Sequence, residues 1–236
     1  MEGRRSMRDD FLNAWETLEL PWRESLELAW QSCAAGTVGV GSVITDSNGA
    51  MVARGRNRVY DGRSGTEILR DTPIAHAEMN AFATLSSSLD LTQHTLWSSQ
   101  QPCPLCAAAS VFMHIGSVRF LAADPFFQGV ERLPELNPFL AERWPRYDGP
   151  TNDDRWAVTA MLLQLSAAAS RNPGGSVVIE NRKIEPETTG LVEDIVARRL
   201  WSDAANKQVA VTGALEIVWP QILDVADRRK QRRHSS

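Results

Sequence analysis

Four residues in the middle of the sequence have the types and the spacing of a metal-dependent hydrolytic site. His76 and Glu78 lie two positions apart in TPIAHAEMNAF, residues 72–82, and Cys103 and Cys106 form a C-x-x-C pair in SQQPCPLCAAA. One imidazole and two thiolates are three protein ligands, the number typical of a catalytic zinc site that leaves a fourth position to water. A structural zinc site normally has four protein ligands.

The cysteine pair is predicted to open a helix. Cys106 follows Cys103 by three positions, so a helix that begins at Cys103 places both sulfurs on one face. Pro104 suits the first turn of such a helix. The free N–H groups and the dipole at a helix N-terminus favour thiolate over thiol, and the thiolate is the form that binds a metal.

Glu78 is predicted to act on the water at the open position. Zinc lowers the pKa of a bound water to near neutrality, and a carboxylate beside it can accept the proton and deliver it to a substrate. Alone, an H-x-E motif is common, and a C-x-x-C pair also occurs in redox and structural sites. Together, HAE followed downstream by PCPLC is the signature of zinc deaminases.

The motifs AHAEMNAF and PCPLC resemble those of the cytidine-deaminase-like superfamily, and within it the branch of guanine, cytosine and tRNA adenosine deaminases. The resemblance covers roughly residues 22–125 and includes VGVGSVITDSNG as a first hairpin. It implies an α/β protein with a three-layer α/β/α fold and a five-stranded mixed sheet. It also implies one Zn2+ per chain, held by His76, Cys103 and Cys106, with Glu78 shuttling protons while a catalytic water displaces an exocyclic amine.

The same resemblance suggests three substrate contacts. Asn57 falls where the family has an asparagine that hydrogen-bonds the base or the sugar; a simple turn residue after a strand is the competing interpretation. Ala77 lies between His76 and Glu78, where small side chains leave room for a flat substrate. Asp124 follows the strand after the cysteine helix, where several relatives have an acidic residue near the substrate, and it equally suits the cap of a turn.

Two further features concern the surroundings of the site. Phe126 and Phe127 are either a stacking face for a base or part of the core or an interface. Gln101 stands directly before Pro-Cys, where many relatives have a glutamate. The glutamine keeps the capacity for hydrogen bonding but removes a charge from the site.

The elements that must position these residues alternate along the first half of the chain. Apolar spacing and Pro21 predict two N-terminal helices, and an Asn-Gly pair predicts a β-hairpin. A polar loop leads to the His76 helix, which we expect to run to about Ser88. The expected order is helices 9–20 and 21–36, strands 37–46 and 51–57, loop 58–72, helix 76–88, strand 94–99, helix 103–115 and strand 117–124.

The second half is less regular. Residues 125–152 contain five prolines and are expected to be loop. A helix is predicted over 153–170, the fifth strand over about 176–180 (SVVIE), and closing helices over 188–205 and 206–229. The segment 130–172 is then an insertion in the fold. The chain divides into an N-terminal helical extension, 1–21, a zinc-deaminase core, 22–125, and a remainder, 126–236, packed on that core.

The composition is ordinary for a globular protein. The chain has 236 residues, 43% of them hydrophobic, and a net charge of −4, which gives no indication of binding to nucleic acid or to an anionic membrane. No apolar run reaches the ~20 residues of a membrane helix, and a cytoplasmic location is expected. Cys33 is predicted to be a small buried residue. The C-terminal RRKQRRHSS is expected to be a solvated, frayed tail, with nucleic-acid contact as the alternative.

Three functions from different classes remain open. The favoured hypothesis is a deaminase of a small aminated heterocycle, either a free base or a nucleoside, with a weak preference for purines and a cytosine-type substrate as runner-up. The second is an adenosine deaminase acting on tRNA or another nucleic acid. The third is a domain without catalytic activity in which zinc is structural. This hypothesis does not explain the presence of Glu78. A homodimer is expected from the family, and the eight tryptophans offer apolar surface for it.

Overall fold

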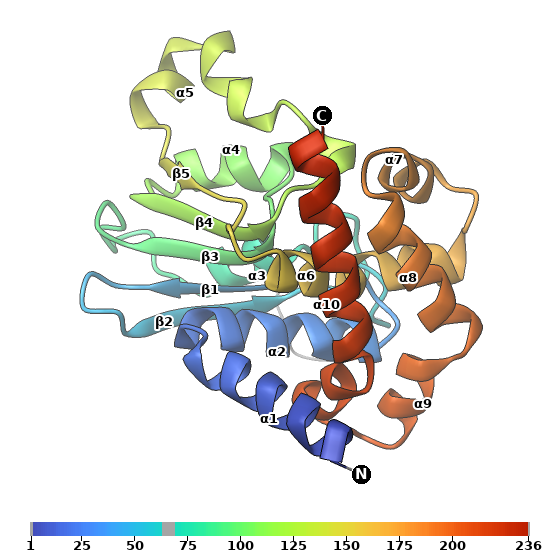
Figure 1. Ribbon diagram of the computed structural model, residues 1–236. Coiled ribbons are helices and arrows are strands. Elements are labelled where there is room, and N and C mark those ends of the chain that lie inside the picture. The colour runs from blue at the N-terminus through green and yellow to red at the C-terminus, as the bar shows by residue number, and fades with distance from the viewer. Residues whose placement is uncertain (1, 63–68, 236) are drawn as a thin grey trace.

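The computed structural model of the protein describes residues 2–62 and 69–235 (Figure 1). The polar loop expected over 58–72 therefore lies partly outside the described residues, at 63–68. Among the described residues, no helix combines the length and the apolar character that crossing a bilayer requires.

A five-stranded sheet in the order β2-β1-β3-β4-β5 forms the centre of the molecule. β1 pairs antiparallel with both β2 and β3, whereas β3 and β4, and β4 and β5, pair in parallel. This confirms the predicted mixed sheet. The strands are β1 (Gly41–Thr45), β2 (Met51–Arg56), β3 (Thr95–Gln100), β4 (Ser117–Ala122) and β5 (Arg146–Asp148).

The β1–β2 hairpin forms as its sequence predicts. Gly49 has a φ of 82°, the left-handed conformation that glycine adopts without strain. The Asp46 carboxylate accepts hydrogen bonds from the N–H groups of Asn48 and Ala50, which holds the turn. All five residues of β1 are buried, because the strand lies inside the sheet and is covered on both faces.

The predicted fifth strand, residues 176–180, is wrong. These residues begin helix α7 (Ser176–Ile184), and the fifth strand is the three-residue β5, within the proline-rich stretch expected to be loop. In α7, Val178 is buried while Ile179 is partly exposed, so the β-branched run occupies a helix with one covered face. Because 130–172 contains β5 and helix α6, that segment is part of the fold and not an insertion.

Helices cover both faces of the sheet and give the three-layer α/β/α arrangement (Figure 1). α2 (Leu20–Ala34) and α6 (Asp154–Arg171) pack on one face. α3 (Ala77–Phe82) packs on the other face, next to α4 (Pro104–Phe112). α6 is buried on nearly every side because further helices cover the side that faces away from the sheet.

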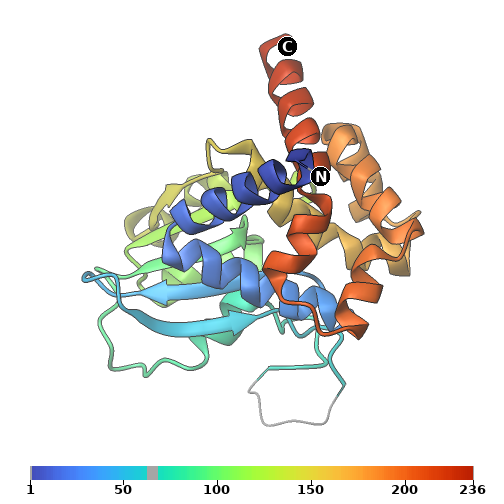
Figure 2. The same ribbon diagram turned by 60° about the horizontal axis from the view of Figure 1, so that its bottom comes forward.

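These outer helices enlarge the core on the α6 side. They are α1 (Glu2–Thr17), α8 (Pro186–Ala197), α9 (Leu200–Asn206) and α10 (Val211–Ser235), together with α7. α1 lies beside α10 (Figure 2), where the rings of Phe11 and Trp219 are 5.1 Å apart and the Trp219 indole N–H donates to Asp10. Seven of the eight tryptophans are buried in the chain's own core, so they provide no argument for a dimer interface.

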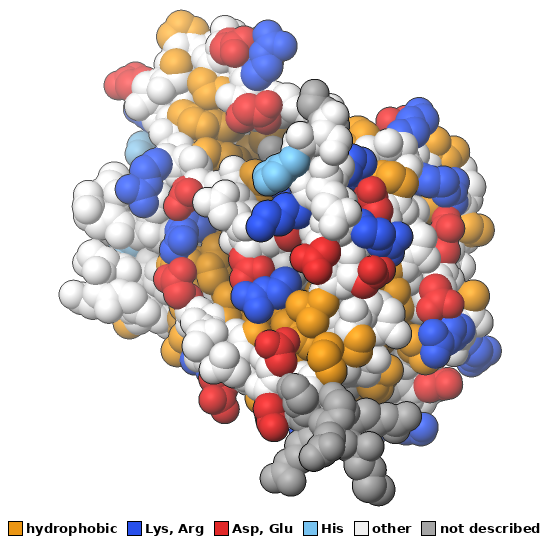
Figure 3. Space-filling view, viewed as in Figure 1, with side chains coloured by type: hydrophobic (Ala, Val, Ile, Leu, Met, Phe, Trp, Pro, Cys, Tyr) orange, Lys and Arg blue, Asp and Glu red, His pale blue; other side chains and the backbone are white. Residues whose placement is uncertain are grey.

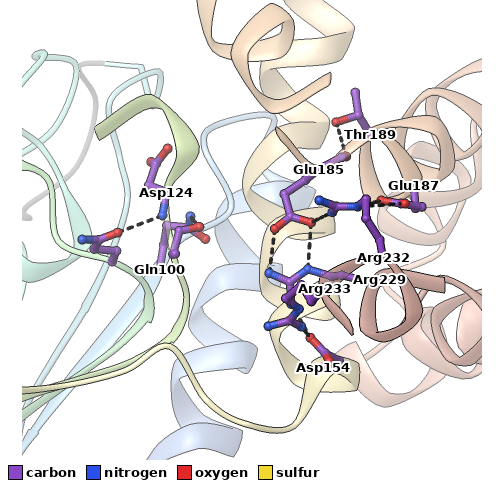
Figure 4. A network of polar contacts seen from close by, with 11 residues as sticks. Gln100, Asp124, Asp154, Glu185, Glu187, Thr189, Arg229, Arg232 and Arg233 are labelled. Carbon is purple, nitrogen blue, oxygen red and sulfur yellow. Dashed lines mark hydrogen bonds and ion pairs between the residues drawn. The ribbon is translucent and has the colours of Figure 1, made fainter. Parts of the chain in front are cut away.

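The basic C-terminal segment is not a frayed tail. α10 continues to Ser235, and Arg229 is 3% exposed with its guanidinium bonded to Glu185 at 2.7 Å and paired with Asp154 (Figure 4). Arg232 pairs with Glu185 and Glu187. The acidic partners lie at the starts of α6 and α8, far away in the sequence, so the segment's ordering depends on tertiary contacts.

A close approach of β2 to α3 sets the position of the His76 motif. A Cβ atom on Gly55 would lie 2.1 Å from the Ala77 carbonyl oxygen and 2.4 Å from the Ala81 nitrogen, so only glycine fits there. α3 is shorter than predicted: it ends at Phe82, and the Thr84 hydroxyl donates to the Ala81 carbonyl at the end of the helix.

Gly55→Ala should lower the free energy of unfolding by about 2–3 kcal/mol, because backbone atoms of α3 must move to admit the methyl group. Urea denaturation followed by circular dichroism measures this change. Gly190→Ala in α8 is the matched control, since a Cβ atom at Gly190 would meet no neighbouring atom within 4 Å, and it should stabilise the helix by about 0.5–1 kcal/mol. Equal stability of the two variants would contradict the close-approach argument.

Arg229→Met should lower the free energy of unfolding by about 3 kcal/mol, because it leaves the buried Glu185 carboxylate with fewer cationic partners. The neighbouring Arg228→Met is the control. Arg228 pairs with Asp224 at the exposed surface, and its loss should change the same quantity by less than about 1 kcal/mol. Thermal and urea unfolding of both variants give the comparison, and similar small losses would refute a structural role for the ion cluster.

A candidate metal centre at one edge of the sheet

Four strand ends meet at one edge of the sheet and bring the motif residues together. β3 and β4 are parallel, so their carboxyl ends lie at the same edge. The antiparallel β1 begins at this edge, and β2 ends there. The segments that leave or enter the four strands therefore carry Val40, Asn57, Cys103 and Asp124 to one place.

His76, Cys103 and Cys106 form a compact group of three ligand atoms. The His76 Nδ1 atom lies 3.4 Å from Sγ of Cys103 and 3.5 Å from Sγ of Cys106, and the two sulfurs are 3.7 Å apart. Around a tetrahedral zinc with bonds of about 2.3 Å to sulfur and 2.0–2.1 Å to nitrogen, the S–S distance is about 3.8 Å and the N–S distance about 3.6 Å. The three residues therefore fit a tetrahedral zinc ion.

The starts of α3 and α4 hold two of these ligands in place. His76 is the N-cap of α3 and Cys103 the N-cap of α4. Hydrogen bonding between the two cysteines lowers the pKa of Cys103 to about 4 and raises the pKa of Cys106 well above its ordinary value, so the pair shares one proton in the metal-free protein.

Glu78 is a buried carboxylate beside the ligand group. It is 3% exposed; its Oε1 accepts a hydrogen bond of 3.0 Å from the Ser98 hydroxyl, and its Oε2 lies 3.4 Å from Sγ of Cys106. Ser42 on β1 donates in turn to Ser98. Burial raises the pKa of Glu78 above its ordinary value, because a charged carboxylate is poorly solvated there.

A cavity of about 260 Å³ opens over this group. His76, Glu78 and Cys103 line it, as do Asn57 and Asp124, whereas Ala77 lies fully buried behind its wall. The other lining residues are mostly apolar or carry amides: Val38, Val40, Val59, Tyr60, Pro73, Gln100, Gln101, Phe127 and Gln164. A metal site, a buried carboxylate and a small cavity are thus continuous.

Comparison with known proteins agrees with this geometry. Residues 16–122 match the model of the cytidine and deoxycytidylate deaminase zinc-binding region. Residues 16–122 belong to the cytidine-deaminase-like superfamily. Zinc is the cofactor of this deaminase region, and the group of His76, Cys103 and Cys106 is able to hold it.

Individual proteins similar to the deaminase region are named as different enzymes. A tRNA-specific adenosine deaminase of Bacillus subtilis is 34% identical over 111 residues, which are 45% of this chain and 63% of that protein. A tRNA(Ile)-lysidine synthase of Deinococcus radiodurans is 31% identical over 51% of this chain but only 19% of that protein. The chain therefore spans less than two thirds of the length of these two curated relatives. The solved guanine deaminase of Nitrosomonas europaea is 21% identical, covers 62% of this chain and 86% of its own, and has a TM-score of 0.46.

Asn57 holds a turn and also lines the cavity, and its contact with a substrate stays a prediction. Its Oδ1 accepts hydrogen bonds from the Thr37 hydroxyl, at 3.0 Å, and from the Val59 N–H, at 3.1 Å, so the residue does hold a turn. The Val59 N–H fixes which end of the amide is oxygen, so the Nδ2 end is the donor of this cavity-lining residue.

Asp124 likewise caps a turn and faces the cavity of the deaminase region. Its Oδ1 accepts a hydrogen bond of 2.9 Å from the Phe126 N–H, and burial raises its pKa to about 6. The Gln101 Oε1 accepts from the Asp124 N–H at 3.0 Å, so the glutamine that replaces the usual glutamate supports this turn. Phe127 lines the cavity, whereas Phe126 is partly exposed.

Four polar residues of the site were not predicted from the sequence. Ser42 and Ser98 support Glu78, and Gln100 and Gln164 line the cavity. The serines had a signal, because a serine in an apolar strand that is buried on both faces needs a polar partner. Gln164 had none, since nothing local distinguishes it from the other residues of α6.

Cys106→Ala should reduce the zinc content from about one ion per chain to a small fraction and lower the melting temperature, because metal binding stabilises the folded state. Plasma emission spectrometry and calorimetry measure the two effects. Cys33→Ala is the control: burial raises the pKa of Cys33 to about 12, which keeps it a thiol outside the group, so zinc content should not change. Full zinc loading of Cys106→Ala would remove Cys106 from the ligand set.

Proposed function

We propose that the protein is a zinc-dependent hydrolytic deaminase that removes an exocyclic amine, as ammonia, from a small aminated heterocycle. The observation that carries this proposal is the position of Glu78, which is buried, held through Ser98 and directed at the cavity beside the three ligands. A zinc site with a merely structural role has no use for a buried carboxylate with a raised pKa.

The proposed chemistry depends on the proton that Glu78 carries. Zinc, when bound at His76, Cys103 and Cys106, lowers the pKa of a water toward neutrality. Glu78 accepts a proton as the water attacks the amine-bearing carbon, and returns it to the substrate so that ammonia departs. Its raised pKa suits both steps, because a proton shuttle works best when its pKa is near the working pH. The Ser98 hydroxyl keeps the carboxylate in place.

The lining of the cavity supports a substrate of the size of a base or a nucleoside. Its volume, about 260 Å³, is at or below the low end of the range for small-molecule sites. In this proposal the Asn57 amide donates to the substrate and Asp124 accepts from it, whereas Ala77, which does not line the cavity, makes no contact with the substrate. Valines and Phe127 form flat apolar walls for the ring. Between the two ring types, we propose a purine-type substrate ahead of a cytosine-type one.

A tRNA adenosine is the second candidate substrate, because a tRNA-specific adenosine deaminase is among the relatives. The charges of this chain favour the small molecule. Arg229, Arg232 and Arg233 of the C-terminal helix are paired with acidic residues, and cationic and anionic side chains are interspersed over the face that carries α10 (Figure 3). A nucleic-acid surface needs cations available for phosphates. The cytoplasmic location and the homodimer stay predictions.

Glu78→Gln should abolish ammonia release, with kcat reduced by at least about 10²-fold, while zinc stays near one ion per chain, because the amide cannot carry the proton. A coupled ammonia assay across free bases, nucleosides and an adenosine-containing tRNA anticodon stem measures the loss and identifies the substrate class. Glu135→Gln, at an exposed ion pair with Arg132, is the control and should retain full activity. Normal turnover by Glu78→Gln would exclude this mechanism.

A further inference from the structure

Two glutamine side chains in the cavity have carboxamide oxygens without a partner. Gln100 is 4% exposed and Gln164 is 8% exposed, and both line the cavity over the metal group. Neither Oε1 atom accepts a hydrogen bond from any of the described residues. A buried acceptor without a donor is unfavourable, and at a cavity wall a bound ligand or a water is able to supply the donor.

The orientation of Gln100 is determined by its neighbour. Its Nε2 donates a hydrogen bond of 3.0 Å to the Ala123 carbonyl oxygen, just beyond the end of β4. Since a carbonyl only accepts, the nitrogen must face Ala123, and the oxygen is the atom left without a partner. Gln100 thus offers a fixed acceptor close to Asp124, which Figure 4 places beside it.

Gln164 comes from α6, outside residues 16–122 that match the family model. It lies among the fully buried Leu162, Leu163 and Leu165. The other polar side chains of this part of α6 are satisfied locally: the hydroxyls of Thr159 and Ser166 donate to backbone carbonyls four residues earlier. A glutamine without such a bond, in a helix that is buried on nearly every side, has no evident structural role. Since no hydrogen bond fixes its amide, the oxygen is able to turn to an N–H group of a ligand.

The remaining lining residues restrict the ligand further. Among the described residues around the cavity, none is lysine or arginine, so none of these lining residues is a cation that could bind a phosphate group. The carboxylate of Asp124 and the unpaired Oε1 of Gln100 are acceptors at this wall, and the amide nitrogen of Asn57 is a donor. The matching ligand is uncharged or cationic and flat, and it carries ring N–H donors.

We propose that Gln100 and Gln164 are specificity-determining residues that accept hydrogen bonds from ring N–H groups of an unphosphorylated free base. The inference rests on the proposed function and narrows its substrate class. A free base has a ring N–H at the nitrogen that carries the sugar in a nucleoside. A nucleoside or nucleotide lacks this donor, so it leaves an acceptor unpaired and is rejected.

The test uses zinc-loaded protein and two pairs of probes that differ by one N–H group: guanine with 9-methylguanine, and cytosine with 1-methylcytosine. Calorimetry or competition measures the dissociation constant, and ammonia release measures kcat and KM. The protein should bind at least one free base at least tenfold more tightly than its methylated counterpart. Whichever of Gln100→Leu and Gln164→Leu removes the acceptor of the distinguishing N–H should abolish most of this preference. Each variant should raise KM for the base at least tenfold while kcat changes less than threefold.

Two further variants separate specificity from a general loss of structure. Gln164→Glu keeps an acceptor oxygen and should retain the preference for the N–H probe. Gln221→Leu removes an amide whose oxygen is equally without a partner but which lies on α10, away from the cavity, and should bind like the unaltered protein. All four variants are checked for zinc content and near-ultraviolet circular dichroism.

The inference is overturned if both members of each pair bind equally to the unaltered protein, if none of the four probes binds, or if neither leucine variant changes the preference within a pair. Binding with the expected preference but without ammonia release would leave these residues as specificity determinants and count against the proposed deamination alone.

Discussion

Three ligand atoms can share one tetrahedral ion only if each lies within about 3.8 Å of the others, and this requirement constrains much of the fold. His76 and Cys103 each stand at the start of a short helix, so the starts of α3 and α4 must meet. α3 reaches its position because β2 approaches it through Gly55, which has no side chain to prevent contact. α4 reaches its position because it directly follows β3 at the edge where β1 begins and β2 and β4 end.

The burial of Glu78 at this edge decides the chemistry available there. Glu78 is nearly inaccessible to solvent, and burial raises its pKa. An isolated buried carboxylate would be strongly unfavourable, but the Ser98 hydroxyl satisfies one of its oxygens and Ser42 supports that serine. The neighbouring strands β1 and β3 thus each carry a buried serine that supports the Glu78 carboxylate, directly from β3 and through Ser98 from β1.

The helices beyond residue 122 complete the site and also stabilise the molecule. α6 is covered by the sheet on one side and by outer helices on the other, so it is apolar nearly all round. Gln164, its one amide at the cavity, is therefore unusual in this helix, because its Oε1 has no hydrogen-bond partner. At its first residue, α6 also binds the C-terminal helix through Asp154 and Arg229. The family-matched region supplies the metal group, and this chain's own C-terminal half supplies a wall of the cavity.

The sequence alone determined the features that depend on residues close together along the chain. The ligand pair Cys103 and Cys106, the His76–Glu78 motif and the Asn-Gly hairpin each act within one turn of helix or one β-turn, where spacing dictates geometry. Only the tertiary structure decided which segment became the fifth strand, because a three-residue β5 beside β4 left the β-branched run at 176–180 to form a helix. It likewise decided that the basic C-terminus is ordered and that Gln164 faces the cavity. Both depend on partners that lie far away in the sequence, which local pattern and propensity do not encode.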